Sequence, residues 1–83
     1  MLAVTKAKYL NDYKIQIEFN DGKSGSLDLE KALWGPVFTP LKNKNKFKSF
    51  HLSKTLHTIQ WSNDADFAPE FLYQKMIEQN HST

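Results

Sequence analysis

The sequence contains no cysteine and no arginine, and it has only three glycines among 83 residues. Without cysteine the chain can form no disulfide, no thiol nucleophile and no thiolate metal site. Without arginine it lacks the side chain that recognises phosphates and guanine edges through paired hydrogen bonds. The glycines, at positions 22, 25 and 35, do not have the spacing of a phosphate-binding loop or a dinucleotide fingerprint. These absences argue against a thiol enzyme and against a nucleotide-binding fold.

Long apolar runs are absent as well. No stretch approaches the roughly 20 residues of a membrane span, and residues 1–11 have no signal-peptide core, so we expect a cytoplasmic protein with no membrane partner. Hydrophobic residues make up 40% and charged residues 24%, which is ordinary for a folded domain. A chain of this length buries about 64% of its surface. We therefore expect one domain over residues 1–79, a frayed tail over 80–83, and a small core that a partner would extend.

The first third of the chain predicts strands. Residues 13–19 alternate between apolar and polar side chains, the pattern of a half-buried strand, with the apolar face formed by Tyr13, Ile15, Ile17 and Phe19. Asn20-Asp21-Gly22 favours a tight hairpin. The return strand, 23–29, places Leu27 and Leu29 on the core side, with Gly25 as a candidate bulge. Together with a strand over 4–9, this pattern predicts a three-stranded antiparallel meander.

Helical signals follow the meander. Asp28 is a candidate cap for a turn over 29–34 that Gly35-Pro36 would stop, and Thr39-Pro40 indicates the start of a second short helix. Two further strands are predicted, one around 50–52 and one over 56–61, with a turn at 53–55. Pro69 begins the clearest helix, whose apolar stripe comprises Pro69, Leu72, Tyr73, Met76 and Ile77. The predicted fold class is α+β: an antiparallel β-meander of about five strands, one or two short helices and a C-terminal amphipathic helix.

Positive charge is concentrated in the middle of the chain. Residues 31–63 contain six lysines and no acid, whereas residues 64–83 contain one lysine and four acids. Because lysines beside an aromatic ring can hold a nucleic-acid backbone, a basic patch is a candidate contact, formed by Lys42, Lys44, Lys46, Lys48 and Lys54. The absence of arginine and of a recognisable nucleic-acid-binding motif favours a solvated loop instead.

The sequence gives little support to catalysis or metal binding. No serine lies in a nucleophile-elbow context, and no histidine–carboxylate pair follows from the spacing. The acids between Asp64 and Glu70 flank Pro69, a position that fits helix capping better than a cation loop. His51 and His57 lack the further ligands that zinc needs. We therefore expect no enzyme, no catalytic residue, no metal site and no cofactor.

Aromatic residues make up 13% of the chain, and most of them must lie in the core. Trp34 lies in a tight turn where a large ring can hardly be enclosed, and Phe67 and Phe71 lie on the lead into the helix. Because Trp and Phe are enriched at interface centres, we expect an interaction surface containing Trp34, Phe67 and Phe71. A second copy or a different small protein would cover it, and homodimers are the more frequent outcome among small soluble proteins.

A third interpretation is a small-ligand sensor with a pocket between sheet and helix. Its signature would be a polar cleft lined by Trp61, Asn63, Asp66 and Tyr73. Polar side chains that converge on a mostly apolar hollow are typical of ligand sites. This interpretation stays open beside the interaction surface and the basic patch.

Several short motifs occur in a characteristic order. They include Asp12-Tyr13, Asp21-Gly22, Asp28-Leu29, Val37-Phe38 and, as the most specific stretch, Ile59-Gln60-Trp61-Ser62-Asn63 followed by Asp66, Pro69 and Leu72-Tyr73. Over nearly the whole chain this order resembles DUF2442, a bacterial family of small domains of unknown function. That family typically has a glycine where this chain has Asp64.

The resemblance implies a compact α+β fold on an antiparallel meander and no reaction, since members have no established catalytic residues. Such domains occur alone or beside helix-turn-helix segments, and many are encoded next to another small protein, as in a toxin–antitoxin pair. We expect no helix-turn-helix unit after residue 83, so a regulatory role would run through a partner. The predicted function is a non-enzymatic protein-interaction or regulatory module, the antitoxin-like member of a bacterial two-gene pair. The alternatives are a nucleic-acid-binding domain using residues 42–54 and a small-ligand sensor.

Overall fold

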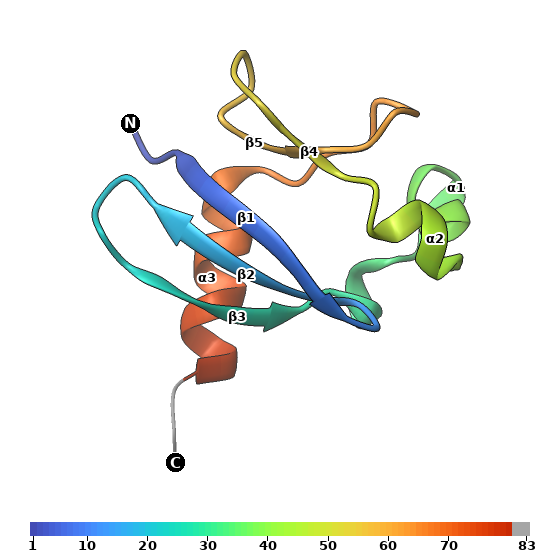
Figure 1. Cartoon of the computed structure of the whole chain (residues 1–83), viewed down its shortest axis with the longest axis horizontal. Helices are drawn as coiled ribbons and strands as arrows, with labels where there is room; N and C mark the ends of the chain where they lie inside the picture. The colour runs from blue at the N-terminus through green and yellow to red at the C-terminus, as the bar shows by residue number, and fades with distance from the viewer. Residues whose placement is uncertain (81–83) are drawn as a thin grey trace.

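The computed structural model describes residues 1–80 of the chain (Figure 1). Its elements are β1 (Val4–Asn11), β2 (Lys14–Phe19), β3 (Ser24–Asp28), η1 (Glu30–Ala32), α1 (Gly35–Phe38), η2 (Thr39–Lys42), α2 (Lys44–Phe47), β4 (His51–Ser53), β5 (Thr58–Gln60) and α3 (Pro69–Asn80). The strands pair antiparallel in a three-stranded sheet, β1-β2-β3, and a two-stranded sheet, β4-β5. The predicted α+β class is confirmed, with its five strands divided between two sheets.

Strand β2 has the predicted alternation. Ile15, Ile17 and Phe19 are buried, and the polar residues between them are exposed or half-buried. Gly22, with a φ of +88°, makes the turn into β3, because a tight hairpin needs a residue that adopts positive φ without strain. The register of the meander therefore follows from the sequence pattern.

Gly25 does not form the predicted bulge, because every residue of β3 pairs with one residue of β2. Its small size instead allows helix α3 to approach the sheet. A β-carbon at Gly25 would lie 3.2 Å from Cγ of Met76 and 3.3 Å from Nδ2 of Asn80. The glycine marks a close strand–helix contact, which is the other common reason for glycine inside a strand.

Short helical turns connect the two sheets. Asp28 Oδ1 accepts a hydrogen bond from Glu30 N at 2.9 Å at the start of η1, near the predicted position. Gly35-Pro36 was predicted to stop a helix and instead begins one, because Gly35 has a φ of +85° and Pro36 occupies the first turn of α1. Asn43 caps α2 by accepting a hydrogen bond from Lys46 N at 3.2 Å.

The β4–β5 hairpin is smaller than predicted, since β5 spans Thr58–Gln60 and residues 54–57 form the turn. In that turn His57 has a φ of +58° and donates its N–H to Ser53 O at 2.9 Å. His57 O accepts a hydrogen bond from Val4 N at 2.9 Å. This bond joins the hairpin to the start of β1.

Helix α3 begins at Pro69 as predicted and crosses one face of the meander (Figure 1). Leu72 and Met76 are buried and Tyr73 is half-buried, but Ile77 is 40% exposed. Ile77 belongs to the predicted apolar stripe but is not covered by the sheet, because the last turns of α3 extend past β3, which is the edge strand. Within residues 1–80, no helix has both the length and the apolarity needed to cross a membrane.

The predicted tail begins with Asn80, which is in fact the last residue of α3. Its side chain donates to Ser26 O at 2.6 Å and to Met76 O at 2.7 Å. The rest of that tail, 81–83, lies outside the described residues.

Aromatic residues form the centre of the core. Trp61 and Phe47 are fully buried with ring centroids 5.7 Å apart, and Trp61 Nε1 donates to Phe47 O at 2.7 Å. The buried hydroxyl of Thr58 donates to Phe67 O at 2.6 Å. Among the described residues every buried side-chain nitrogen and oxygen has a hydrogen-bond partner, so the core leaves no uncompensated polar group there.

Candidate functional site

Trp34 is held at the surface by the residues on either side of it. Leu33 is buried, and its N–H donates to Glu30 O at 3.2 Å at the end of η1. Gly35 has a φ of +85°, which turns the chain away into α1. Trp34 itself is extended and 73% exposed. The local sequence thus presents a large ring to solvent on a backbone that is fixed at both ends.

Three phenylalanines stack beside this turn. The Phe67 ring lies nearly parallel to that of Phe38, with centroids 4.5 Å apart, and to that of Phe71, with centroids 5.2 Å apart. Phe38 belongs to α1, Phe67 to the segment before α3, and Phe71 to the first turn of α3. The stack therefore joins α1 to α3. Phe67 is 7% exposed and Phe71 36%.

These elements border a groove of about 740 Å³, which we call the aromatic groove, with the η1–α1 segment on one side and α3 on the other. Its apolar lining includes Trp34, Pro36, Val37, Phe38, Phe67 and Phe71, and its charged residues are Asp28, Glu30, Lys31 and Lys75. All three residues of the predicted interaction surface line this one groove. Phe67 lines the groove but is buried, because the neighbouring rings of the stack cover it. The sequence had suggested that Phe67 would be exposed.

Sequence reasoning missed Val37, Lys75 and Gln79 among the residues of the groove. Lys75 and Gln79 follow the predicted Phe71 at intervals of four, which places all three on one face of a helix. That spacing could have identified the wall formed by α3. Val37 had no such signal, because the preceding Gly35 was interpreted as the end of a helix rather than its beginning.

Gln79 lies where the groove meets the edge of the sheet. Its Nε2 donates to Asp28 O at 2.9 Å, and its Oε1 accepts from Asp28 N at 2.7 Å. The neighbouring Asn80 Nδ2 donates to Ser26 O at 2.6 Å. Because β3 is an edge strand, these amide side chains bind backbone groups that would otherwise face solvent.

The four residues predicted as a polar cleft have different neighbours. Trp61 is 1% exposed, and its N–H is bonded inside the core, so it lines no cleft open to solvent. Asn63 accepts a hydrogen bond from the backbone of its own loop, and Asp66 is exposed and forms an isolated antiparallel bridge with Gln60 of β5. The Tyr73 hydroxyl donates to Asp21 Oδ2 at 2.6 Å on the β2–β3 hairpin. The fold does not bring these four side chains together.

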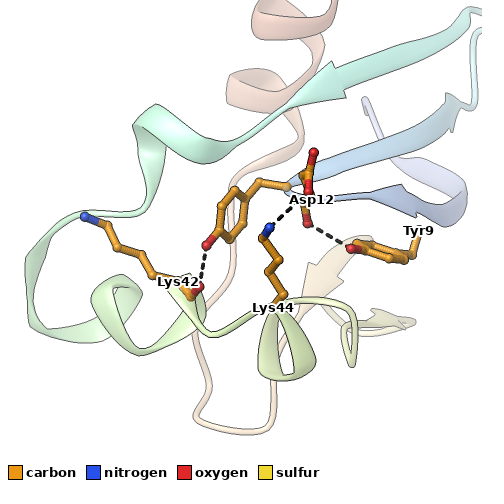
Figure 2. Close-up of polar contacts among 5 residues, drawn as sticks. Tyr9, Asp12, Lys42 and Lys44 are labelled. Atoms are coloured by element: carbon orange, nitrogen blue, oxygen red, sulfur yellow. Dashed lines mark hydrogen bonds and ion pairs between the residues drawn. The ribbon is translucent and has the colours of Figure 1, made fainter.

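The lysines of the predicted basic patch are all exposed. Lys44 Nζ lies 3.0 Å from Asp12 Oδ1 and 5.8 Å from the centroid of the Tyr13 ring (Figure 2). The hydrogen bond that this ammonium donates to the Asp12 carboxylate raises the pKa of Lys44. The Tyr13 hydroxyl also donates to Lys42 O. The lysine-rich segment is therefore attached to the β1–β2 turn, whereas Lys54 lies apart on the β4–β5 turn.

Asp21 and Tyr73 connect the β2–β3 hairpin to α3. Their hydrogen bond lowers the pKa of the Asp21 carboxyl and raises the pKa of the Tyr73 hydroxyl. The contact is on the surface, where it joins the helix to the hairpin.

His51 lies on β4 and His57 in the following turn, and both are exposed. Within residues 1–80, no three side chains of the metal-binding types gather closely enough to hold a metal ion.

The fold matches a solved structure over its whole length. The crystal structure named "Putative DNA Binding Protein NE0471", from Nitrosomonas europaea ATCC 19718, superposes with a TM-score of 0.85 at 18% sequence identity. The match covers 100% of this chain and 54% of that one, so the chain spans about half the length of the protein it resembles. At this identity the likeness shows a shared fold. No curated protein matches the chain significantly.

The family comparison gives a more specific result. The family described as "Protein of unknown function (DUF2442)" matches residues 4–78. This range extends from the first residue of β1 to the last turns of α3. It includes the motifs from Asp12-Tyr13 to Leu72-Tyr73 on which the resemblance was based. The chain therefore belongs to the DUF2442 family.

Proposed function

We propose that this domain is a non-enzymatic protein-interaction module whose binding surface is the aromatic groove and whose occupant is an apolar segment of a different small protein. The observation that carries the proposal is the position of Trp34, 73% exposed on the turn between η1 and α1 at the side of a largely apolar groove. Tryptophan is enriched among the residues that dominate binding energy at interfaces. An aromatic side chain left in solvent beside a groove has its apolar surface still to bury.

The charges around the groove suit a neutral, apolar occupant. Asp28 and Glu30 are balanced by Lys31 and Lys75, so a strongly charged partner gains little there. A nucleic-acid backbone would gain least, because its phosphates need an excess of positive charge. A polypeptide segment with apolar side chains fits both the lining and the volume of the groove.

A second copy of the chain fits the groove less well than a different protein. In a two-fold dimer Trp34 of each copy would have to enter the groove of the other copy, and the ring would then no longer form the wall of its own groove. The exposed leucines Leu52 and Leu56 lie on the β4–β5 hairpin. If that hairpin occupied the groove of a second copy, the contact would be head-to-tail, and such contacts form rings or open chains rather than a closed dimer.

The family resemblance makes this proposal more specific by suggesting which protein the partner is. If the adjacent gene encodes another small protein, the two products form a pair in which this chain is the antitoxin-like or regulatory member. Its binding to the partner through the aromatic groove would then be the regulatory event. This role rests on the family resemblance, which is a weaker argument than the groove itself.

The test is a calorimetric titration of the chain with the purified product of the adjacent gene. We expect binding that Trp34→Ala and Phe71→Ala each weaken at least tenfold, the range typical of hot-spot residues. Leu56→Ala is the matched control, because Leu56 is an exposed apolar residue outside the groove, and it should bind like the wild type. Binding that neither groove variant weakens, or no binding, contradicts the proposal.

Light scattering of the chain alone separates the two occupants. We expect a monomer of 9.7 kDa. A dimer that Trp34→Ala converts to monomer would show that the groove holds a second copy, and the proposed heterologous partner would then be wrong.

Nucleic-acid binding is a second candidate, because a protein of the same fold is named a putative DNA-binding protein and the lysines of residues 42–54 are exposed. The name belongs to a chain of which this domain matches 54%. Here the segment contains no arginine. Its helix α2 is four residues long, which is too short to follow a DNA groove in the manner of a recognition helix.

A further inference from the structure

The aromatic groove lies at one end of the β3 edge. It meets the strand at Asp28, and a second hollow of about 520 Å³ lies near the other end, lined by Lys23, Ser24, Met76, Ile77 and Asn80. Ile77, which the sheet leaves 40% exposed, contributes apolar surface there. The edge of β3 thus runs from one partly apolar hollow to another over five residues.

Gln79 and Asn80 bind this edge between the two hollows. The Gln79 carboxamide donates to the carbonyl and accepts from the N–H of the same residue, Asp28, at 2.9 and 2.7 Å. A residue in an antiparallel partner strand makes this same pair of bonds. Asn80 Nδ2 donates a hydrogen bond of 2.6 Å to Ser26 O, the next outward-facing carbonyl of the strand. The two side chains therefore stand in for the peptide groups of a missing neighbouring strand.

We infer that the edge of β3, Ser24–Asp28, is a β-augmentation site for an extended segment of the partner protein, and that the Gln79 and Asn80 side chains close it until the segment displaces them. The inference rests on the proposed function, because the segment's apolar side chains enter the aromatic groove and the hollow beside Ile77. Backbone pairing along an edge supplies affinity, and pockets for alternate side chains supply specificity.

The occupant is extended because the groups on offer are those of a strand edge. It comes from another protein because the β3 edge of a second copy is closed by the same Gln79 and Asn80 side chains, so edge-to-edge pairing of two copies would have to displace both sets. Edge protection alone is the competing explanation, since native proteins commonly cover their edges. That explanation gives no reason for apolar hollows at both ends. The bonds also come from exposed side chains on the last turn of α3, where displacing them leaves Leu72 and Met76 packed.

The experiment uses as its probe a synthetic linear peptide. It is taken from a displayed peptide library selected on the wild-type chain. We expect Gln79→Ala to bind this peptide on the order of tenfold more tightly, because the segment no longer displaces two hydrogen bonds. Gln74→Ala is the matched control, since Gln74 is an exposed glutamine of the same helix that contacts Glu78. It should bind like the wild type.

Two further measurements test the backbone pairing. Methylation of a peptide nitrogen that points toward β3 should abolish binding. Methylation of a nitrogen that points away from β3 should leave binding unchanged. In Gln79→Ala the Asp28 amide should exchange quickly when free and slowly when the peptide is bound. If Gln79→Ala fails to fold by circular dichroism, Gln79→Glu takes its place, because a carboxylate cannot donate to Asp28 O and should shift affinity in the same direction.

The outcomes separate the inference from the proposed function. Peptides that need Trp34 and Phe71 but are indifferent to Gln79→Ala and to nitrogen methylation would keep the groove as a binding surface and overturn the β-augmentation site. Peptides that need neither Trp34 nor Phe71 would overturn both. Enrichment of no peptide at all would also count against both.

Discussion

At the scale of single residues, Ile17 tests the register of the meander. It is 1% exposed and pairs with Gly25, the residue against which Met76 of α3 packs. Ile17→Ala should reduce the free energy of unfolding by about 2–5 kcal/mol, whereas Gln16→Ala, on the exposed face, should change it by less than about 0.5 kcal/mol. Urea unfolding of both variants measures this. Equal losses would mean that the two faces of β2 have been assigned wrongly.

Asp21 and Tyr73 provide a prediction about pH. The pKa of Asp21 is lowered in the folded chain, so its contribution to stability is present above the unfolded value of about 3.9 and is lost as pH falls through the lowered one. The pKa of Tyr73 is raised, so its contribution is present below about 10 and is lost as pH rises through the raised value.

Tyr73→Phe removes this hydrogen bond and keeps the edge-on contact of the ring with Phe19, whose centroid is 4.9 Å away. The variant should be less stable than the wild type near neutral pH, and the difference should shrink in acid and in strong base. Urea unfolding across the pH range measures it, and carboxyl NMR of Asp21 should show the pKa return toward its ordinary value. A difference that stays constant with pH would contradict this assignment.

At the scale of elements, Gly35 determines how η1 meets α1. It has a φ of +85°, and a β-carbon there would face open space among the described residues. Gly35→Ala should therefore reduce the free energy of unfolding only by the left-handed backbone penalty, about 1–2 kcal/mol. It should also change the orientation of the neighbouring Trp34 ring. Gly22→Ala is the matched control, with a φ of +88° and equal space on a remote hairpin.

The readout is quenching of tryptophan fluorescence by acrylamide, which reports on exposed Trp34 because Trp61 is buried. Both glycine variants should lose similar stability in urea, but only Gly35→Ala should alter quenching. Altered quenching in Gly22→Ala as well would mean that general destabilisation, and not the local turn, controls the Trp34 ring.

Elements with a strong local pattern were predictable from the sequence. The alternation from Tyr13 to Phe19 and the start of α3 at Pro69 were both predicted correctly, because each depends on neighbouring residues. Gly25 and Ile77 were not, because their environments depend on where α3 crosses the sheet. A strand glycine fits a bulge or a close helix equally well, and a helical stripe does not reveal where the sheet beneath it ends.

The candidate site was predictable in the same partial way. Trp34 and Phe71 could be found because each is a large ring with little room in its local segment. The polar cleft could not be judged, because the Trp61 N–H donates to Phe47 O inside the core, whereas the Tyr73 hydroxyl donates to Asp21, 52 residues away along the chain. Long-range partners of this kind have no local signal.

At the scale of the whole molecule, charge and apolar surface lie in different places. The aromatic groove has balanced charges, whereas residues 31–63 carry six lysines and no acid. Part of that excess is neutralised in space, because Lys44 pairs with Asp12 from the β1–β2 turn. The positive charge available to bind a polyanion is therefore smaller than the sequence suggests. The exposed ion pair itself contributes little to the stability of the fold.

We accordingly predict weak, sequence-independent binding of labelled DNA and RNA, in the range of about 10⁻⁴ to 10⁻⁶ M at physiological salt, falling steeply as salt rises and counterions compete. Alanine substitution of Lys44, Lys46 and Lys48 together should lower the salt dependence, because fewer phosphates are neutralised. Trp34→Ala should not alter it, since the groove is a separate surface. Fluorescence anisotropy at low and moderate salt measures all three chains. Tight, sequence-dependent binding at moderate salt that disappears in the triple lysine variant would make nucleic-acid recognition, and not protein interaction, the function of this domain.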